Sequence, residues 1–181
     1  SHIRNVREKI LSKIEEIIKA QDIAVVIVMD ISNTMTTNDM VGSSITRVDE
    51  AKSAAKQFIN KFYEEASASD AKSAKRQIGF VTFATSSYEV FGLQDCKTTN
   101  QRDSMLSKVN SITTKTTDER FTNMEAGLSR AQNMLNNSQI QNKYIIFLTD
   151  GLPTTYSTTV GGYTGYNPQD PSLRLSNGAV P

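Results

Sequence analysis

Two apolar runs that each lead into an aspartate constrain the fold of this chain more than any other feature. The first, Ile23–Met29, is unbroken and rich in β-branched residues, and Asp30 follows it directly. The second covers residues 144–148 and leads through Thr149 to Asp150. Short apolar runs of this kind predict strands that are covered on both faces. Ligands bind beyond the carboxyl ends of such strands, so the two carboxylates are expected to meet at one edge of the sheet.

The rest of the first 150 residues alternates between helical and strand patterns. Apolar residues recur at helical spacing in residues 46–65, 102–109 and 123–135, and residues 78–83 and 88–93 predict a hairpin. In the last of these helices Met124, Leu128, Ala131 and Leu135 are expected to face the core. This alternation predicts an α/β fold with an open, mostly parallel, doubly wound sheet, helices on both faces and one antiparallel edge strand.

Composition excludes several classes of function. The formal net charge of +1 leaves no basic excess for phosphate-driven nucleic-acid binding. One cysteine, Cys96, rules out an internal disulfide framework and a cysteine-rich zinc site, and it has no neighbouring histidine that would make it a reactive thiol. The one histidine of this sequence is His2, in a Ser1-His2 pair that resembles the remnant of a cleaved tag. With no histidine elsewhere, Ser–His and Cys–His catalysis are left without a base. The longest apolar run is far shorter than the roughly 20 residues that span a bilayer, so no membrane span is expected here.

The polar residues at the two strand ends form a set of oxygen donors. Asp30, Ser32 and Thr34 occupy alternate positions after the first strand, Asp150 follows the other, and Thr122 precedes the helix at residues 123–135. Carboxylate and hydroxyl oxygens without nitrogen or sulfur favour a hard divalent cation, Mg²⁺ or alternatively Mn²⁺ or Ca²⁺. A bound cation would also relieve the repulsion between the two carboxylates.

A purely structural interpretation of the same residues stays open. Asp30 and Ser32 are also typical of helix N-caps and turns, and Thr122 is expected to cap the helix that follows it.

The combination of these motifs resembles the metal-ion-dependent adhesion site of the von Willebrand factor type A family, the relatives of integrin I domains. That site reads Asp-x-Ser-x-Ser, a distant Thr and a later Asp-Gly, which Asp30, Ser32, Thr34, Thr122 and Asp150 match. Residues 78–83 also resemble the second strand of the family, and the likeness covers residues 23–153. The sequence departs from the pattern in having Thr34 in place of Ser and Asn33 in place of Gly, which bears on metal affinity.

The resemblance implies a non-catalytic protein-binding domain. The five residues would hold the ion directly or through water, and a carboxylate of a protein ligand would fill the remaining position, with host extracellular matrix as a candidate partner. A change between direct contacts from Thr122 and from Asp150 would accompany low and high affinity for the ligand. Family members of this kind place the protein at the cell surface, in a cell wall or a pilus, as an adhesin or pilus-tip protein.

Three segments are expected from these patterns. Residues 1–22 predict an amphipathic helix, residues 23–153 the type A-like domain, and residues 154–181 an irregular stretch rich in Gly, Pro and Tyr. Family domains usually continue with further strands after the Asp-Gly motif, so we expect those strands to be missing from this chain and the last segment to be an insertion beside the metal or a disordered tail.

Two other functions remain as alternatives. One is an intracellular scaffold domain that binds no metal. The other is a magnesium-dependent phosphatase of the haloacid-dehalogenase type, whose Asp-x-Asp-x-Thr motif uses its second Asp as general acid. Ser32 stands at that position here and cannot do this.

Overall fold

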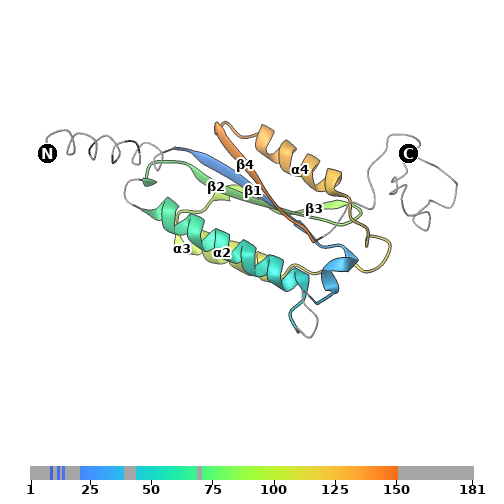
Figure 1. Ribbon diagram of the computed structural model, residues 1–181. Coiled ribbons are helices and arrows are strands. Elements are labelled where there is room, and N and C mark those ends of the chain that lie inside the picture. Colours follow the sequence, from blue (N-terminus) through green and yellow to red (C-terminus); the bar gives the residue numbers. More distant parts are fainter. Residues whose placement is uncertain are drawn as a thin grey trace.

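The computed structural model describes residues 9, 12, 14, 21–38, 44–68 and 71–150. The predicted helix at residues 1–22 lies almost wholly outside these residues, and the irregular segment at residues 154–181 lies entirely outside them. The described elements follow one another along the chain as a strand, helices, a hairpin, more helices and a last strand (Figure 1). Their bounds are β1 Ile23–Asp30, the 3₁₀ helix η1 Asn33–Thr36, α2 Arg47–Ser67, β2 Arg76–Phe83, β3 Ser87–Asp95, α3 Thr99–Asn110, α4 Met124–Asn136 and β4 Asn142–Leu148.

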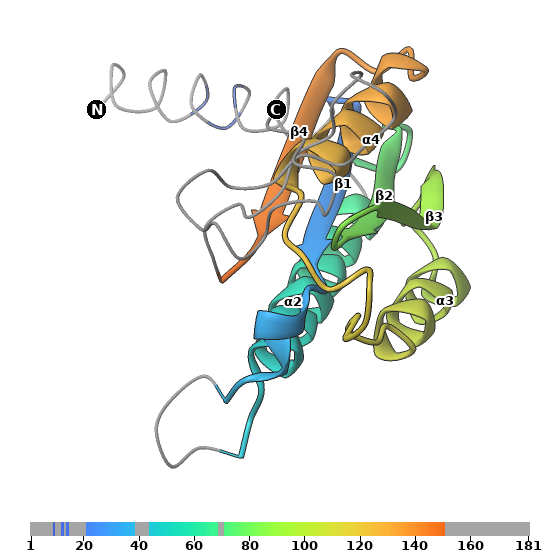
Figure 2. The ribbon, with the colours of Figure 1, turned by 90° about the vertical axis from the view of Figure 1, so that its right-hand side faces the viewer.

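The described strands form one open mixed sheet in the order β3-β2-β1-β4. β1 pairs in parallel with β2 on one side and with β4 on the other, whereas β2 and β3 pair antiparallel as a hairpin. α2 and α3 cover one face of the sheet and α4 covers the other (Figures 1 and 2). The predicted α/β class, with helices on both faces and β3 as the antiparallel edge strand, is therefore confirmed.

The central strand β1 divides the core into two layers because successive side chains point to opposite faces. Ile27 and Met29 pack in the cluster under α2 and α3, and Val26 and Val28 pack in the cluster under α4. All four are completely buried, as the unbroken apolar run predicts for a strand covered on both sides.

Capping boxes set where two of the helices begin. The side chain of Thr46 accepts a hydrogen bond from the Asp49 amide, and that of Thr98 accepts one from the Gln101 amide. In return, the side chains of Asp49 and Gln101 accept hydrogen bonds from the backbone amides of the two threonines. The second box starts α3 at Thr99, three residues before the apolar periodicity that predicted this helix.

Two burial predictions were wrong. Leu128, expected on the inner face of α4, is 42% exposed, because the helix instead lays Gly127, Ala131 and Leu135 against the sheet. The run at residues 144–148 does not form a fully buried strand, since Tyr144 is 56% exposed. β4 has a neighbour on one side only among the described strands, which leaves much of it open. No helix within the described residues is both long and apolar enough to cross a bilayer.

Candidate metal-binding site at the carboxyl ends of the strands

Asp30, the last residue of β1, is the most deeply placed member of the site. Its side chain is completely buried. The Oδ1 atom accepts a hydrogen bond from the Ser32 amide at 2.8 Å, and Oδ2 accepts one from the Thr149 hydroxyl at 2.8 Å. Because β1 and β4 are parallel neighbours, Thr149 and Asp150 leave the sheet at the same edge as Asp30.

Three hydroxyl groups continue from Asp30 towards the second carboxylate. The Oγ1 atom of Thr122 donates to Ser32 Oγ at 3.0 Å, and the hydroxyls of Ser32 and Thr34 lie 3.3 Å apart. Thr34 Oγ1 in turn donates to Asp150 Oδ1 at 3.3 Å. The structure thus brings all five of the sequence-predicted residues into one connected group of oxygen atoms, although they come from three separate stretches of the chain.

The predicted capping role of Thr122 was wrong. Asn123 is the N-cap of α4, and its side chain accepts a hydrogen bond from the Ala126 amide at 3.1 Å. The Asn123 side chain also donates to the Thr85 carbonyl at 3.0 Å, which ties the start of α4 to the β2–β3 turn. Asn123 does the capping, and the Thr122 hydroxyl donates to Ser32. Ser32 precedes η1 and likewise makes no side-chain cap.

The loop that carries Thr122 is braced against β1 and the hairpin. The Lys115 amide donates to the Ile31 carbonyl at 2.7 Å, and the Asn33 amide donates to the Arg120 carbonyl at 3.0 Å. The carboxylate of Glu119 accepts from the Ser86 amide at 3.0 Å and from the Tyr88 hydroxyl at 2.8 Å. These contacts fix the position of the loop without using the hydroxyl of Thr122.

Glu119 is a positioning residue that sequence reasoning missed. Burial raises the pKa of its partner Tyr88, and the hydrogen bond to Glu119 and the negative charge of Glu119 raise it further. A single acidic residue in a polar loop gives no local pattern that would have singled it out.

The electrostatics of the site favour a positive charge. Burial raises the pKa of Asp30 above its usual value. Hydrogen bonds from Ser32 and Thr149 oppose this effect, and the nearby charge of Asp150 adds a smaller increase. Keeping Asp30 ionised therefore costs the folded protein free energy, and a cation among these oxygens would reduce that cost.

The protein itself supplies one cation, which sequence reasoning also missed. Arg47 is the first residue of α2, and its Nη1 atom donates to Asp150 Oδ2 at 2.5 Å. The Arg47 side chain is 37% exposed, whereas that of Asp150 is only 11% exposed. The two residues are more than 100 positions apart in the sequence, and no spacing pattern connects them.

The donor set fits a hard divalent cation. The described residues contain no group of three or more His, Cys, Asp and Glu side chains suited to a metal. The cluster instead offers two carboxylates and three hydroxyls, which suits ions that take oxygen ligands and keep part of their water. It offers no soft ligand of the kind that selects copper or zinc thiolate sites.

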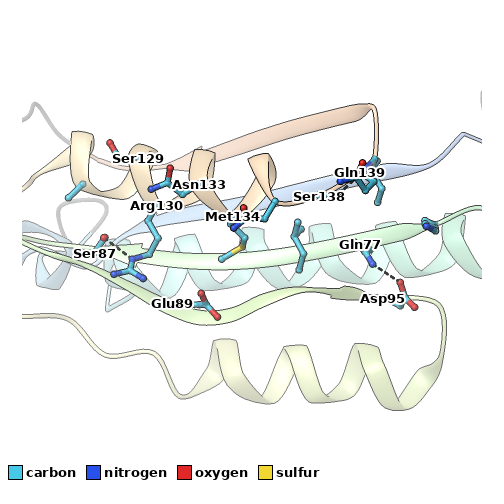
Figure 3. Close-up of a pocket in the computed structure, with 15 residues that line it drawn as sticks. Gln77, Ser87, Glu89, Asp95, Ser129, Arg130, Asn133, Met134, Ser138 and Gln139 are labelled. Carbon is cyan, nitrogen blue, oxygen red and sulfur yellow. Dashed lines mark hydrogen bonds between the residues drawn. The ribbon is translucent and has the colours of Figure 1, made fainter.

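A groove with a volume of about 970 Å³ lies elsewhere, between α4 and the β2–β3 hairpin (Figure 3). Polar side chains dominate its lining. Arg130 reaches from α4 to Ser87 at 2.9 Å, and Gln77 donates to Asp95 at 3.2 Å. None of the five clustered residues lines this groove, so the oxygen cluster is a separate feature of the surface.

Residues 25–152 match the sequence model of the von Willebrand factor type A domain. The chain belongs to this family. The match covers more than half of the chain and includes most of β1, the Thr122 loop and the Asp150-Gly151 pair, and it confirms the resemblance drawn from the motifs. A search of curated protein sequences finds no match.

Solved structures with a similar fold include three bacterial pilus proteins. The vWF domain of the type V pili tip protein Mfa5 from Porphyromonas gingivalis has a TM-score of 0.60 at 20% identity, over 78% of this chain and 43% of that one. The PilB minor pilin from Streptococcus sanguinis has a TM-score of 0.64 at 19% identity, over 87% and 40%. The pilus adhesin SpaC from Lactobacillus rhamnosus GG has a TM-score of 0.54 at 18% identity, over 81% and 18%. At these identities the likeness shows a shared fold, and this chain spans less than half the length of each neighbour.

Proposed function

We propose that this type A domain binds a protein partner through a divalent cation and is not an enzyme. The observation that carries the proposal is the connected group of oxygens formed by Asp30, Ser32, Thr34, Thr122 and Asp150. These residues would hold Mg²⁺, with Mn²⁺ or Ca²⁺ as substitutes. The bound ion would supply a positive charge at the protein surface that attracts a carboxylate of the partner.

The pattern of burial across the five side chains is a second observation, besides their hydrogen bonds, that supports a binding role for this cluster. Asp30 and Ser32 are completely buried and Thr122 is nearly so, whereas Thr34 lies at the exposed side of the cluster. This gradient gives the site a desolvated floor and an accessible rim, where a ligand from outside can approach. Charge interactions are stronger in such a partly desolvated place than in open water.

Three structural neighbours support a location at the cell surface. The neighbours are described as pilus-tip, minor-pilin and pilus-adhesin proteins. We extend this to the present chain as a proposal and name host extracellular matrix as a candidate source of the carboxylate-bearing partner. A metal-independent scaffold remains the second candidate, because Arg47 already provides Asp150 with a positive partner.

A matched pair of threonines in η1 tests the metal dependence. Thr34 Oγ1 belongs to the cluster, whereas Thr36, two residues later in the same short helix, donates to the Asn33 carbonyl at 2.7 Å. Thr34→Val removes an oxygen from the cluster at nearly constant volume, and Thr36→Val is the control. We expect Mg²⁺ to raise the melting temperature of the wild type and of Thr36→Val, and to have little effect on Thr34→Val. Equal behaviour of the two variants, or no effect of Mg²⁺ on the wild type, would contradict the proposal.

The binding role is tested with the same proteins. Immobilised fibronectin and type I collagen serve as carboxylate-rich matrix probes, in Mg²⁺ and in EDTA. Retention that requires Mg²⁺ and is lost in Thr34→Val supports the proposal, whereas retention that persists in EDTA favours the metal-independent alternative.

A further inference from the structure

Arg47 occupies a distinctive place beside the oxygen cluster. Its backbone is fixed, because its amide donates to the Thr37 carbonyl at 2.9 Å and the preceding Thr46 forms the capping box of α2. Its side chain then reaches from this anchored position to Asp150 and stays partly open to solvent. The charged group is therefore held near the site but is free to leave it towards water.

The two oxygens of Asp150 have different partners. Oδ1 accepts from the hydroxyl of Thr34 and so belongs to the cluster, whereas Oδ2 pairs with the guanidinium of Arg47. A divalent cation among the hydroxyls would draw on the same carboxylate and would be repelled by the positive charge of Arg47. Asp150 cannot give its full negative charge to both cations at once.

We propose that Arg47 is a built-in competitor of the metal, which holds Asp150 in the metal-free protein and is displaced from it when the cation binds. This inference rests on the proposed function, because it concerns the same site. It adds a residue outside the five predicted ligands that sets the affinity for metal. The metal-free protein gains from the arrangement, since Asp150 keeps a positive partner next to the buried Asp30.

Calorimetric titration of Mg²⁺ into three proteins tests the inference: the wild type, Arg47→Gln and the control Arg130→Gln. Both substitutions lower the net charge by one. Arg130 lies on α4, where it donates to Ser87 at the hairpin groove and not to the cluster (Figure 3). We expect Arg47→Gln to bind Mg²⁺ at least about fivefold more tightly than the wild type, a change of about 1 kcal/mol. Arg130→Gln should stay within about twofold, as screened distant charges do.

A second readout follows Arg47 directly. The Nε–Hε signal of Arg47 in a ¹⁵N-labelled wild type, assigned by its loss in Arg47→Gln, should shift as Mg²⁺ is added, and the signal of Arg130 should not. In EDTA, Arg47→Gln should also unfold at a lower temperature than Arg130→Gln, because Asp150 loses its partner.

The outcomes separate this inference from the proposed function. If the wild type binds Mg²⁺ and Arg47→Gln binds equally or more weakly, or if both arginine variants tighten binding alike, the competition is refuted and the metal site stands. If only Arg47→Gln binds Mg²⁺, Arg47 blocks the cation in the wild type and is not displaced by it, so both the displacement and the metal dependence proposed for the wild type are refuted. If none of the three proteins binds Mg²⁺, both proposals fail.

Discussion

Replacing Gly127 by alanine tests how the fold positions the site. Gly127 lies on the face of α4 that packs on the sheet, and a Cβ atom there would stand 2.8 Å from Phe83 Cδ1 and 3.0 Å from Val28 Cγ1. Phe83 is completely buried and stacks on Phe147 with ring centroids 5.2 Å apart. Because the ring is enclosed in the core, the added methyl group must displace either Phe83 or α4, and we expect part of the strain to move α4 away from the sheet.

Two opposing effects set the size of the change. Forcing one extra carbon into a packed core costs about 1–3 kcal/mol. Alanine gains roughly 1 kcal/mol over glycine inside a helix. We therefore expect Gly127→Ala to lower the free energy of unfolding by about 1 kcal/mol. Since Thr122 directly precedes the cap of α4, the displaced helix should also weaken Mg²⁺ binding.

Urea unfolding and Mg²⁺ calorimetry measure the two effects on the same samples. Gly92→Ala in β3 is the control, because the nearest atom to a Cβ there is the flexible end of Glu89 at 3.3 Å. This variant should unfold within about 0.5 kcal/mol of the wild type. A Gly127→Ala protein that is more stable than the wild type, with unchanged Mg²⁺ affinity, would refute the close contact between α4 and the sheet.

Three further predictions concern the site and the core. Burial raises the pKa of Asp30, so the folded protein holds the proton of this carboxyl more tightly than the unfolded chain does. In EDTA the stability of the protein should therefore fall as the pH rises from the usual pKa of aspartate through the raised pKa of Asp30. Asp30→Asn should therefore be more stable than the wild type at pH 7 in EDTA, as measured by urea unfolding, and should not bind Mg²⁺; lower stability would contradict the cost assigned to the buried charge. Thr122→Ala should lose about 1 kcal/mol of stability with its hydrogen bond to Ser32, but most of its Mg²⁺-dependent retention on the matrix probes, whereas Thr122→Ser should keep both. Equal losses in folding and binding would count against a ligand role for Thr122. Burial raises the pKa of the Cys96 thiol to about 11, so iodoacetamide at pH 8 should label Cys96 only in denaturant, and rapid labelling of the native protein would contradict its burial.

The architecture followed from the sequence because its strongest signals are local. The apolar run of β1 predicts a strand buried on both faces, and the alternation of helical and strand patterns along the chain predicts the class of the sheet. The meeting of Asp30 and Asp150 also followed, since parallel strands deliver their carboxyl ends to one edge. Thr122 carries no periodic signal; its place before the next helix suggested it as a donor, and the family resemblance supported that choice.

The remaining features depend on which parts of the chain meet in space. Leu128 fits the helical stripe of α4, yet Gly127 allows the helix to approach the sheet on a different face. Arg47 and Glu119 act through partners on other elements, and a single charged residue in a sequence does not reveal its partner. Asn is preferred over Thr at N-cap positions, so the sequence alone already favoured Asn123 over Thr122 as the cap of α4.

We have proposed that five oxygen-bearing side chains form a site for a divalent cation. Crystals of the domain grown in Mn²⁺, measured at the manganese absorption edge, would show whether an ion occupies it. We expect one anomalous peak among the side chains of Ser32, Thr34 and Asp150, with the Arg47 guanidinium moved away from Asp150. A map without a peak at this place, in which Arg47 still pairs with Asp150 at saturating Mn²⁺, would contradict it.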